Sequence, residues 1–165
     1  MINIMNKISL EQQVFSLNSQ VEDPDISIEQ NLITINSLLK QHPKNPELIC
    51  IKADVYYQMA SVKDMTNFAR PIDLYKEALS ICPDNYDTNT KIAIYIYSVQ
   101  ENYENSLPYF KKSIKKIPDE EIVNMYADAL ANLDRVNDAL DAIYNSKLNK
   151  EAIDRIAFEI KEEYT

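Results

Sequence analysis

The stretch NYENSLPYFKKSIKKIP, residues 102–118, has the form of a turn, a helix and a stop. Counted back from Pro118, it has Ser113, Phe110 and Ser106 at intervals of 5, 3 and 4 residues. Residues three and four apart lie on the same face of a helix. This face is therefore predicted to place one large aromatic side chain between two small ones.

The same intervals fit other parts of the chain. Counted back from Pro83 they give Ala78, Tyr75 and Pro71; from Pro43 they give Leu38, Ile35 and Asn31; a fourth copy without a closing proline has Ala139, Ile143 and Ser146. A large apolar or aromatic residue takes the middle place each time. The chain is therefore predicted to repeat one structural unit.

A second spacing marks the helix before each of these. Ala53 and Ala93 follow a proline by ten residues and Ala127 follows one by nine, and three residues later come Tyr56, Ile96 and Leu130. A small residue lets two helix backbones approach, and a large one at i+3 fills the groove beside it. We expect pairs of closely packed helices.

These two spacings together resemble the tetratricopeptide repeat (TPR), with its small residue and tyrosine on the first helix, its A-x3-F on the second and its closing proline. The resemblance covers roughly residues 27–147 and lacks the usual tryptophan. It implies an all-α fold, a right-handed α-solenoid of antiparallel helix pairs, forming a single domain over 1–165. Its parts would be an irregular N-terminal helix pair (1–43), three TPR-like repeats (46–83, 84–118 and 119–147) and a capping helix (150–163).

The 3.6-residue periodicity predicts where the helices lie. The expected ranges are 8–21, 27–41, 46–60, 71–81, 86–99, 105–116, 120–132, 136–145 and 150–163. Pro71 and Pro108 are expected in first turns, where the missing N–H costs nothing, with Asn105 as the cap before Pro108. The long segment between Ala60 and Arg70 has two interpretations, a binding lip or a first helix lengthened by one turn.

The composition argues against several kinds of site. The chain has no glycine, so the Gly-rich phosphate loops and nucleophile elbows are absent. His42 is the only histidine and is read as an exposed helix-end residue; Cys50 and Cys82 are read as core or near-core thiols. We expect no enzyme, no cofactor and no metal site, with a metal at Asp23 and Asp25 as the weaker interpretation of their turn.

The net charge of −9 and pI of about 4.6 oppose a nucleic-acid partner. The sequence shows no run of apolar residues long enough for a signal peptide or a membrane span, so a cytoplasmic location is expected. The one dense basic run is KKSIKK, residues 111–116. A solvated outer face is the favoured interpretation of this run, and binding of an acidic partner is the other.

The TPR resemblance also implies a partner surface, because first helices of successive repeats line a groove in that family. The matching residues here are Glu47, Cys50, Asp54, Tyr57, Asp87, Lys91, Ile94, Tyr97, Glu121, Asn124, Asp128 and Asn132. Most of the charged ones are acidic, so an acidic tail would be repelled. The expected partner is a basic or amphipathic peptide or helix.

Three functions follow, in order of preference. The first is a non-enzymatic adaptor or scaffold that binds another protein. The second is a chaperone for secreted or assembly-bound proteins, because small acidic TPR proteins with an N-terminal helical arm resemble bacterial secretion chaperones; a homodimer through that arm would favour it. The third, an enzyme, has the least support.

Overall fold

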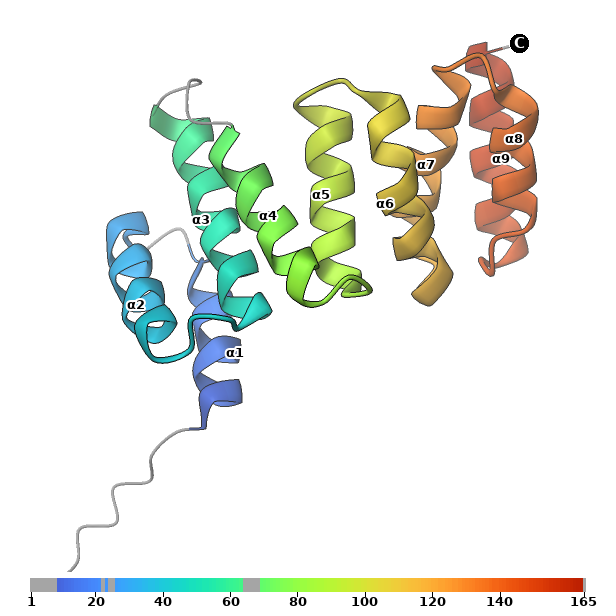
Figure 1. The fold of residues 1–165 in the computed structure, drawn as a ribbon. Coiled ribbons are helices and arrows are strands. Elements are labelled where there is room, and N and C mark those ends of the chain that lie inside the picture. The colour runs from blue at the N-terminus through green and yellow to red at the C-terminus, as the bar shows by residue number, and fades with distance from the viewer. Residues whose placement is uncertain (1–8, 22, 24–25, 64–68, 165) are drawn as a thin grey trace, which may run out of the picture. The chain divides into compact units, whose positions relative to one another are not determined.

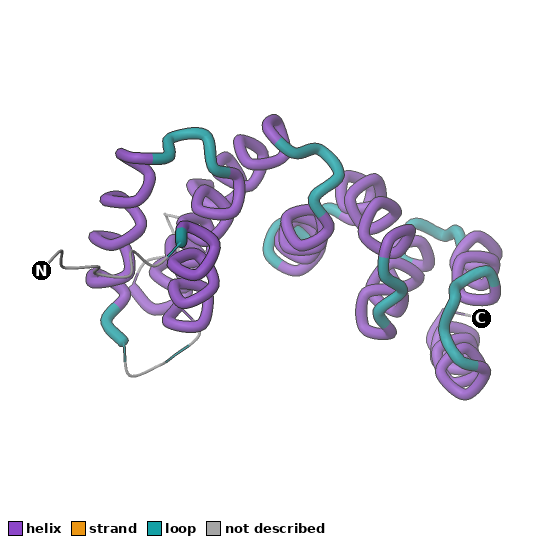
Figure 2. The backbone as a smooth tube through the Cα atoms, turned by 90° about the horizontal axis from the view of Figure 1, so that it is seen from below, coloured by secondary structure: helices purple, strands orange, loops and turns teal. Residues whose placement is uncertain are grey.

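The computed structural model describes residues 9–21, 23, 26–63 and 69–164, and these residues form α-helices joined by short turns, with no strand among them (Figures 1 and 2). The helices are α1 (Leu10–Val21), α2 (Ile28–Gln41), α3 (Pro46–Lys63), α4 (Ala69–Ile81), α5 (Tyr86–Ser98), α6 (Tyr103–Lys116), α7 (Glu120–Ala131), α8 (Val136–Tyr144) and α9 (Lys150–Tyr164). Each lies where periodicity predicts a helix, with ends that differ by at most three residues.

The start of α6 corrects the prediction. Asn105 is not the cap; the Asn102 side chain is, and it accepts a hydrogen bond from the backbone N–H of Asn105 at 3.2 Å. Pro108 therefore lies inside α6 and not in its first turn. The Pro108 ring is exposed, and because proline has no backbone N–H the helix loses one hydrogen bond there. The helix can begin earlier because two asparagines are available and the first of them has the capping geometry.

Two corners use a left-handed backbone without glycine. Glu101 follows α5 with φ of 49° and Asp134 follows α7 with φ of 59°. Beyond them, the N–H of Asn102 donates to the Ile96 carbonyl and that of Arg135 donates to the Leu130 carbonyl, which closes the helix ends. The left-handed conformation costs a non-glycine residue roughly 1–2 kcal/mol. The chain therefore makes tight corners despite its lack of glycine.

The chain divides into two compact units, Met1–Cys82 and Pro83–Thr165, called here the N-terminal and the C-terminal unit. In the N-terminal unit α1, α2 and α3 share one core. Its buried residues are Val14, Leu17, Val21, Ile35, Leu38, Leu48, Ile51 and Val55. The Gln58 side chain of α3 also donates to the Val21 carbonyl at the end of α1, at 2.9 Å. The irregular N-terminal helix pair thus packs on the first good repeat.

The C-terminal unit has a core built from α5 to α9. Phe110, Ala93, Ala127 and Ala139 are fully buried there. The Phe110 ring lies edge-on to Tyr97, with centroids 5.9 Å apart. These four positions, which the two sequence spacings located, are therefore packing positions, as predicted. The expected repeat boundaries and the single-domain assignment over 1–165 stay predictions.

The extra length between the helices of the first repeat is only partly described. Helix α3 continues to Lys63, three residues beyond its predicted end. Met59 packs against the core of the N-terminal unit. Residues 64–68 of the proposed lip, the segment between Ala60 and Arg70, lie outside the described residues. The choice between a lip and a longer helix therefore stays open.

Candidate partner-binding surface

The four predicted surface residues of the N-terminal unit lie along α3, but they differ in exposure. Glu47 and Tyr57 are exposed and Asp54 is half-buried. The prediction that Cys50 belongs to this surface is wrong. The residue is only 4% exposed, so it is a core thiol and offers a partner no surface. Cys50 was assigned to this face because it follows Glu47 by three residues. That position lies at the edge of the core, where neighbouring residues cover a small thiol.

Asp54 is held by a tyrosine of the next helix. The Tyr75 hydroxyl on α4 donates to Asp54 Oδ1 at 2.6 Å. Burial raises the pKa of Tyr75 well above its usual range, and the Asp54 carboxylate raises it further. The phenol therefore stays protonated and remains the donor. Asp54 serves the packing of α3 on α4 as well as the surface.

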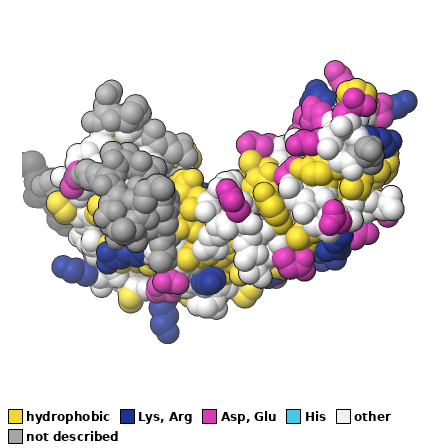
Figure 3. Space-filling view, turned by 90° about the horizontal axis from the view of Figure 1, so that it is seen from above, with side chains coloured by type: hydrophobic (Ala, Val, Ile, Leu, Met, Phe, Trp, Pro, Cys, Tyr) yellow, Lys and Arg dark blue, Asp and Glu magenta, His cyan; other side chains and the backbone are white. Residues whose placement is uncertain are grey.

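The predicted residues of the C-terminal unit lie on α5, on α7 and at the end of α7. Asp87 and Glu121 are exposed, as is Asn132, the C-cap of α7. The rest are half-buried: Lys91, Ile94, Tyr97, Asn124 and Asp128. Figure 3 shows Asp and Glu side chains scattered among hydrophobic ones on one face of this unit. That these residues form a partner surface stays a prediction.

Asp128 is the centre of a hydrogen-bond cluster, called here the Asp128 cluster. The Tyr97 hydroxyl donates to one carboxylate oxygen and the Tyr164 hydroxyl to the other, each at 2.5 Å. Asn132 Nδ2 donates to Asp128 Oδ2 at 3.0 Å and to the Tyr164 hydroxyl at 2.8 Å. Three elements, α5, α7 and α9, thus meet at one carboxylate.

The two phenols of this cluster are held in their neutral form. Burial raises the pKa of Tyr97 and of Tyr164 well above the usual range, and the hydrogen bond to Asp128 adds to the effect. Both phenols and the Asn132 amide donate to the Asp128 carboxylate, so this side chain joins the helices as well as lying at the predicted surface. The repeat pattern predicted three members of this cluster but not Tyr164. The only available signal was an aromatic residue at the end of a predicted capping helix.

Two other predicted residues, Glu121 and Asn124, line a cavity of about 470 Å³ between the start of α7 and the middle of α9. The cavity is called here the acidic cavity. Its other lining residues are Asp119, Glu120, Arg155, Ile156 and Glu159. It therefore gathers four carboxylates around one guanidinium.

Most of the charge in the acidic cavity can be assigned. Arg155 is ion-paired with Glu120. Asp119 caps α7, accepting from the backbone N–H of Glu121 at 3.0 Å. Glu121 and Glu159 remain exposed on the two helices. Glu159 also attracts the Arg155 guanidinium. The cavity is thus net negative, and the Glu121 and Glu159 carboxylates face solvent.

Other side chains with reactive or metal-binding groups lie elsewhere in the described structure. His42 is the exposed C-cap of α2, as predicted for a helix-end residue. Cys50 and Cys82 are both free thiols. Among the described residues no group of three His, Cys, Asp or Glu side chains gathers for a metal ion. Asp25, named for the weaker metal interpretation, lies outside them.

Helices long and apolar enough to cross a membrane do not occur in the part of the chain that the structure describes. No protein-family model matches the chain, and no curated protein matches it. Solved structures do match. MamA from AMB-1 is 17% identical with a TM-score of 0.67, over 92% of this chain and 86% of that one.

Two further solved structures resemble the chain over similar lengths. A thermophilic TPR protein of Thermus thermophilus, TTC0263, is 13% identical with a TM-score of 0.66, over 96% of this chain and 81% of that one. MamA of Desulfovibrio magneticus RS-1 is 11% identical with a TM-score of 0.65, over 94% and 79%. The chain has a TPR-type fold. At these identities the likeness establishes the fold alone, and the predicted class of antiparallel helix-pair repeats is confirmed.

Proposed function

We propose that this TPR-type chain is a non-enzymatic protein-interaction module, an adaptor or scaffold component that acts in the cytoplasm. Its partner is a basic or amphipathic peptide segment, and the acidic cavity receives a Lys or Arg side chain of that segment. The observation that carries the proposal is the cavity itself. It combines carboxylates of α7 and α9, and two of the residues expected at a partner surface, Glu121 and Asn124, line it.

The charge balance of the cavity favours a cation. The N-terminus of α7 contributes about half a positive charge. Asp119, Glu120 and Glu121 at that end exceed it, even after Arg155 neutralises one carboxylate. A Lys or Arg side chain between Glu121 and Glu159 gains two charge-assisted contacts. The Asn124 amide supplies a neutral hydrogen-bonding group beside them.

The proposal is tested by removing the negative charges of Glu121 and Glu159. In the Glu121→Gln, Glu159→Gln double variant, a helical amphipathic peptide bearing Lys and Arg should associate more slowly, with the largest effect at low salt. Glutamine keeps size and polarity, so the fold is preserved. Stopped-flow fluorescence with the labelled peptide measures the rate.

The matched control is Glu162→Gln, Glu163→Gln, which removes the same charge from exposed residues of α9 that do not line the cavity. The control should change the rate far less than the cavity variant. Equal rates for the cavity variant and the unmodified chain at low ionic strength would contradict the proposed site. The wider surface along α3 and α5 stays a prediction.

A chaperone for secreted or assembly-bound proteins is the second candidate. The observation that favours it is the exposure of one large apolar side chain on each N-terminal helix: Phe15 on α1 is 76% exposed and Ile33 on α2 is 63% exposed. Side chains exposed in this way are available to a partner. A homodimer through the N-terminal helices would cover them, and the oligomeric state decides between the two candidates.

A further inference from the structure

The lysines of the run at residues 111–116 point in two directions. Lys112 holds the start of the C-terminal unit: its Nζ donates to the Pro83 carbonyl at 3.1 Å and lies 3.7 Å from the Asp84 carboxylate. Lys111 and Lys115, one helical turn apart, instead line a cavity on another side of α6. The run is therefore not a uniform solvated face.

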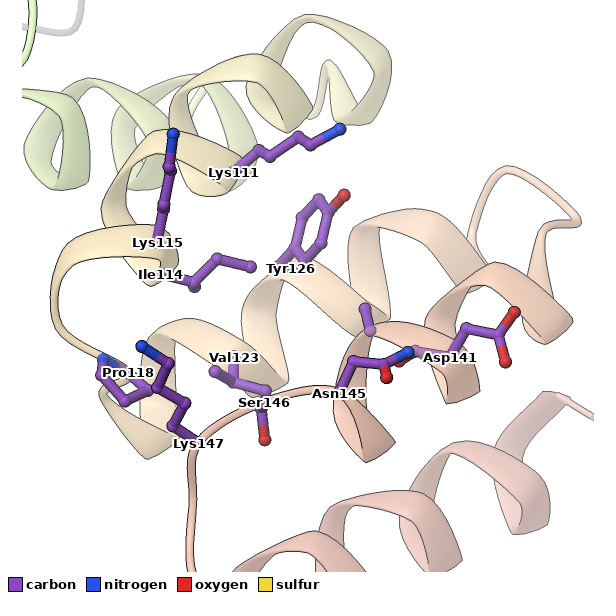
Figure 4. Close-up of a pocket in the computed structure, with 11 residues that line it drawn as sticks. Lys111, Ile114, Lys115, Pro118, Val123, Tyr126, Asp141, Asn145, Ser146 and Lys147 are labelled. Carbon is purple, nitrogen blue, oxygen red and sulfur yellow. The ribbon is translucent and has the colours of Figure 1, made fainter.

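This second cavity, called here the basic cavity, has a volume of about 450 Å³ and lies between α6, α7 and α8 (Figure 4). Its apolar lining comes from Ile114, Pro118, Val123, Tyr126 and Ala142. Three lysines, Lys111, Lys115 and Lys147, stand at its rim. The polar residues Asp141, Asn145 and Ser146 complete it.

The charges at the rim are separated. In Figure 4 Lys115 and Lys147 lie at the left of the cavity and Lys111 lies above Tyr126, while the Asp141 carboxylate is at the right. Within the described residues, none of the three lysines forms an ion pair. The Tyr126 phenol adds no negative charge, because burial raises its pKa. In a chain of net charge −9 this is a local positive site.

One polar group of the cavity also lacks a partner. The Ser146 hydroxyl is buried and makes no hydrogen bond among the described residues. Buried hydroxyls are normally satisfied by protein atoms or ordered water. The Ser146 oxygen exposes almost no surface, so it belongs to the wall of the cavity and is not a contact for a ligand. The apolar floor and the cationic rim are the features that describe one kind of ligand.

We propose that the basic cavity binds a short acidic peptide segment of another protein, with one apolar side chain on the floor and flanking Asp or Glu side chains against Lys111, Lys115 and Lys147. Nucleic acid is disfavoured, because three lysines face the repulsion of the net negative remainder of the chain. A short segment touches the lysines without meeting the acidic surface elsewhere.

This site is separate from the acidic cavity of the proposed function, which lies between α7 and α9. The two cavities select ligands of opposite charge. A failure of the basic cavity to bind would leave the first proposal standing, and the reverse also holds.

The probe is a fluorescein-labelled peptide of Asp and Glu residues with a single central Leu, followed by fluorescence anisotropy at low salt with the full chain. We expect saturable binding that weakens by about tenfold in the triple variant Lys111→Gln, Lys115→Gln, Lys147→Gln, since each partly exposed pair contributes a fraction of a kcal/mol. A second variant, Ala142→Leu, fills the floor and should weaken binding with every charge retained. Amide NMR shifts should centre on Ile114 and Val123.

The matched control is Lys44→Gln, Lys116→Gln, Lys150→Gln, which removes three exposed lysines that do not line the cavity. It should bind the probe nearly as well as the unmodified chain. The proposal is overturned if the peptide does not bind, if a central Ser serves as well as Leu, or if the two triple variants weaken binding equally. It is also overturned if light scattering shows that the cavity lysines hold two copies of the chain together.

Discussion

At the scale of single residues, Asp128 is the side chain whose hydrogen bonds join three helices. Its two carboxylate oxygens accept from Tyr97 and Tyr164 and so join α5 and α9 to α7. Hydrogen bonds to a charged group contribute about 1.5–3 kcal/mol each when buried, and partial exposure reduces this. We expect Asp128→Asn to lower the free energy of unfolding by about 1–2 kcal/mol, measured by urea denaturation at neutral pH. The control Asp154→Asn, on an exposed part of α9, should change it by less than about 0.5 kcal/mol.

Because of these two phenols, the effect of Asp128→Asn on the free energy of unfolding should depend on pH. A tyrosine whose folded pKa is raised contributes its full stability below the unfolded pKa of about 10 and loses it as the pH rises beyond. In the unmodified chain the unfolded phenols ionise first, so stability falls above about pH 10. The difference in free energy of unfolding between the unmodified chain and Asp128→Asn should therefore be largest at neutral pH and should become smaller above about pH 10. A difference that becomes larger there would show that Asp128 does not hold these phenols neutral.

At the scale of helices, Phe110 decides the register of α6 against α5 and α7. Its side chain is fully buried, next to Tyr97 and with its ring centroid 6.3 Å from that of Tyr126. Phe110→Ala should cost about 3–5 kcal/mol, a large part of the 5–15 kcal/mol typical of a folded domain. Thermal unfolding followed by circular dichroism measures the loss. Phe158→Ala, at a ring that is 63% exposed, is the matched truncation and should leave the melting temperature nearly unchanged.

The helices and their packing faces were predictable because both follow from spacing along the chain. The spacing of small and large residues at i, i+3 and i+4 predicted that Ala93, Ala127 and Phe110 are packing positions. All three are fully buried. Capping was less predictable, since Asn102 and Asn105 have the same chemistry and only backbone geometry selects the first. Sequence pattern thus fixes which face of a helix is inside before it fixes where the helix starts.

The candidate sites were less predictable because they join residues distant in sequence. Glu121 and Asn124 were named from the repeat pattern, but their companion Glu159 comes from the capping helix, which lies outside the pattern. Lys147, in the turn after α8, likewise comes near Lys111 only because α6 and α8 both pack on α7. No spacing within one repeat contains these pairs.

At the scale of the whole molecule, the exposed apolar side chains of α1 and α2 motivate a test of self-association. Phe15 on α1 carries the largest exposed fraction among the large hydrophobic side chains described. If the N-terminal helices form a homodimer, light scattering should give twice the chain mass of 19.1 kDa, and Phe15→Ser should return the monomer. The matched control Phe158→Ser changes another exposed ring, on α9, and should leave the mass as it was. A monomer at all concentrations would remove the support for the chaperone candidate.

The Asp128 cluster also makes the chain its own optical reporter. With eleven tyrosines and no tryptophan, its ultraviolet emission comes from phenols alone. An excited phenol is a stronger acid than one in the ground state, so a carboxylate in contact can accept its proton and quench or redshift the emission. Tyr97 and Tyr164 share one such acceptor. Detachment of α9 from α7 should therefore brighten the tyrosine emission, and the docking of this helix can be followed without any label.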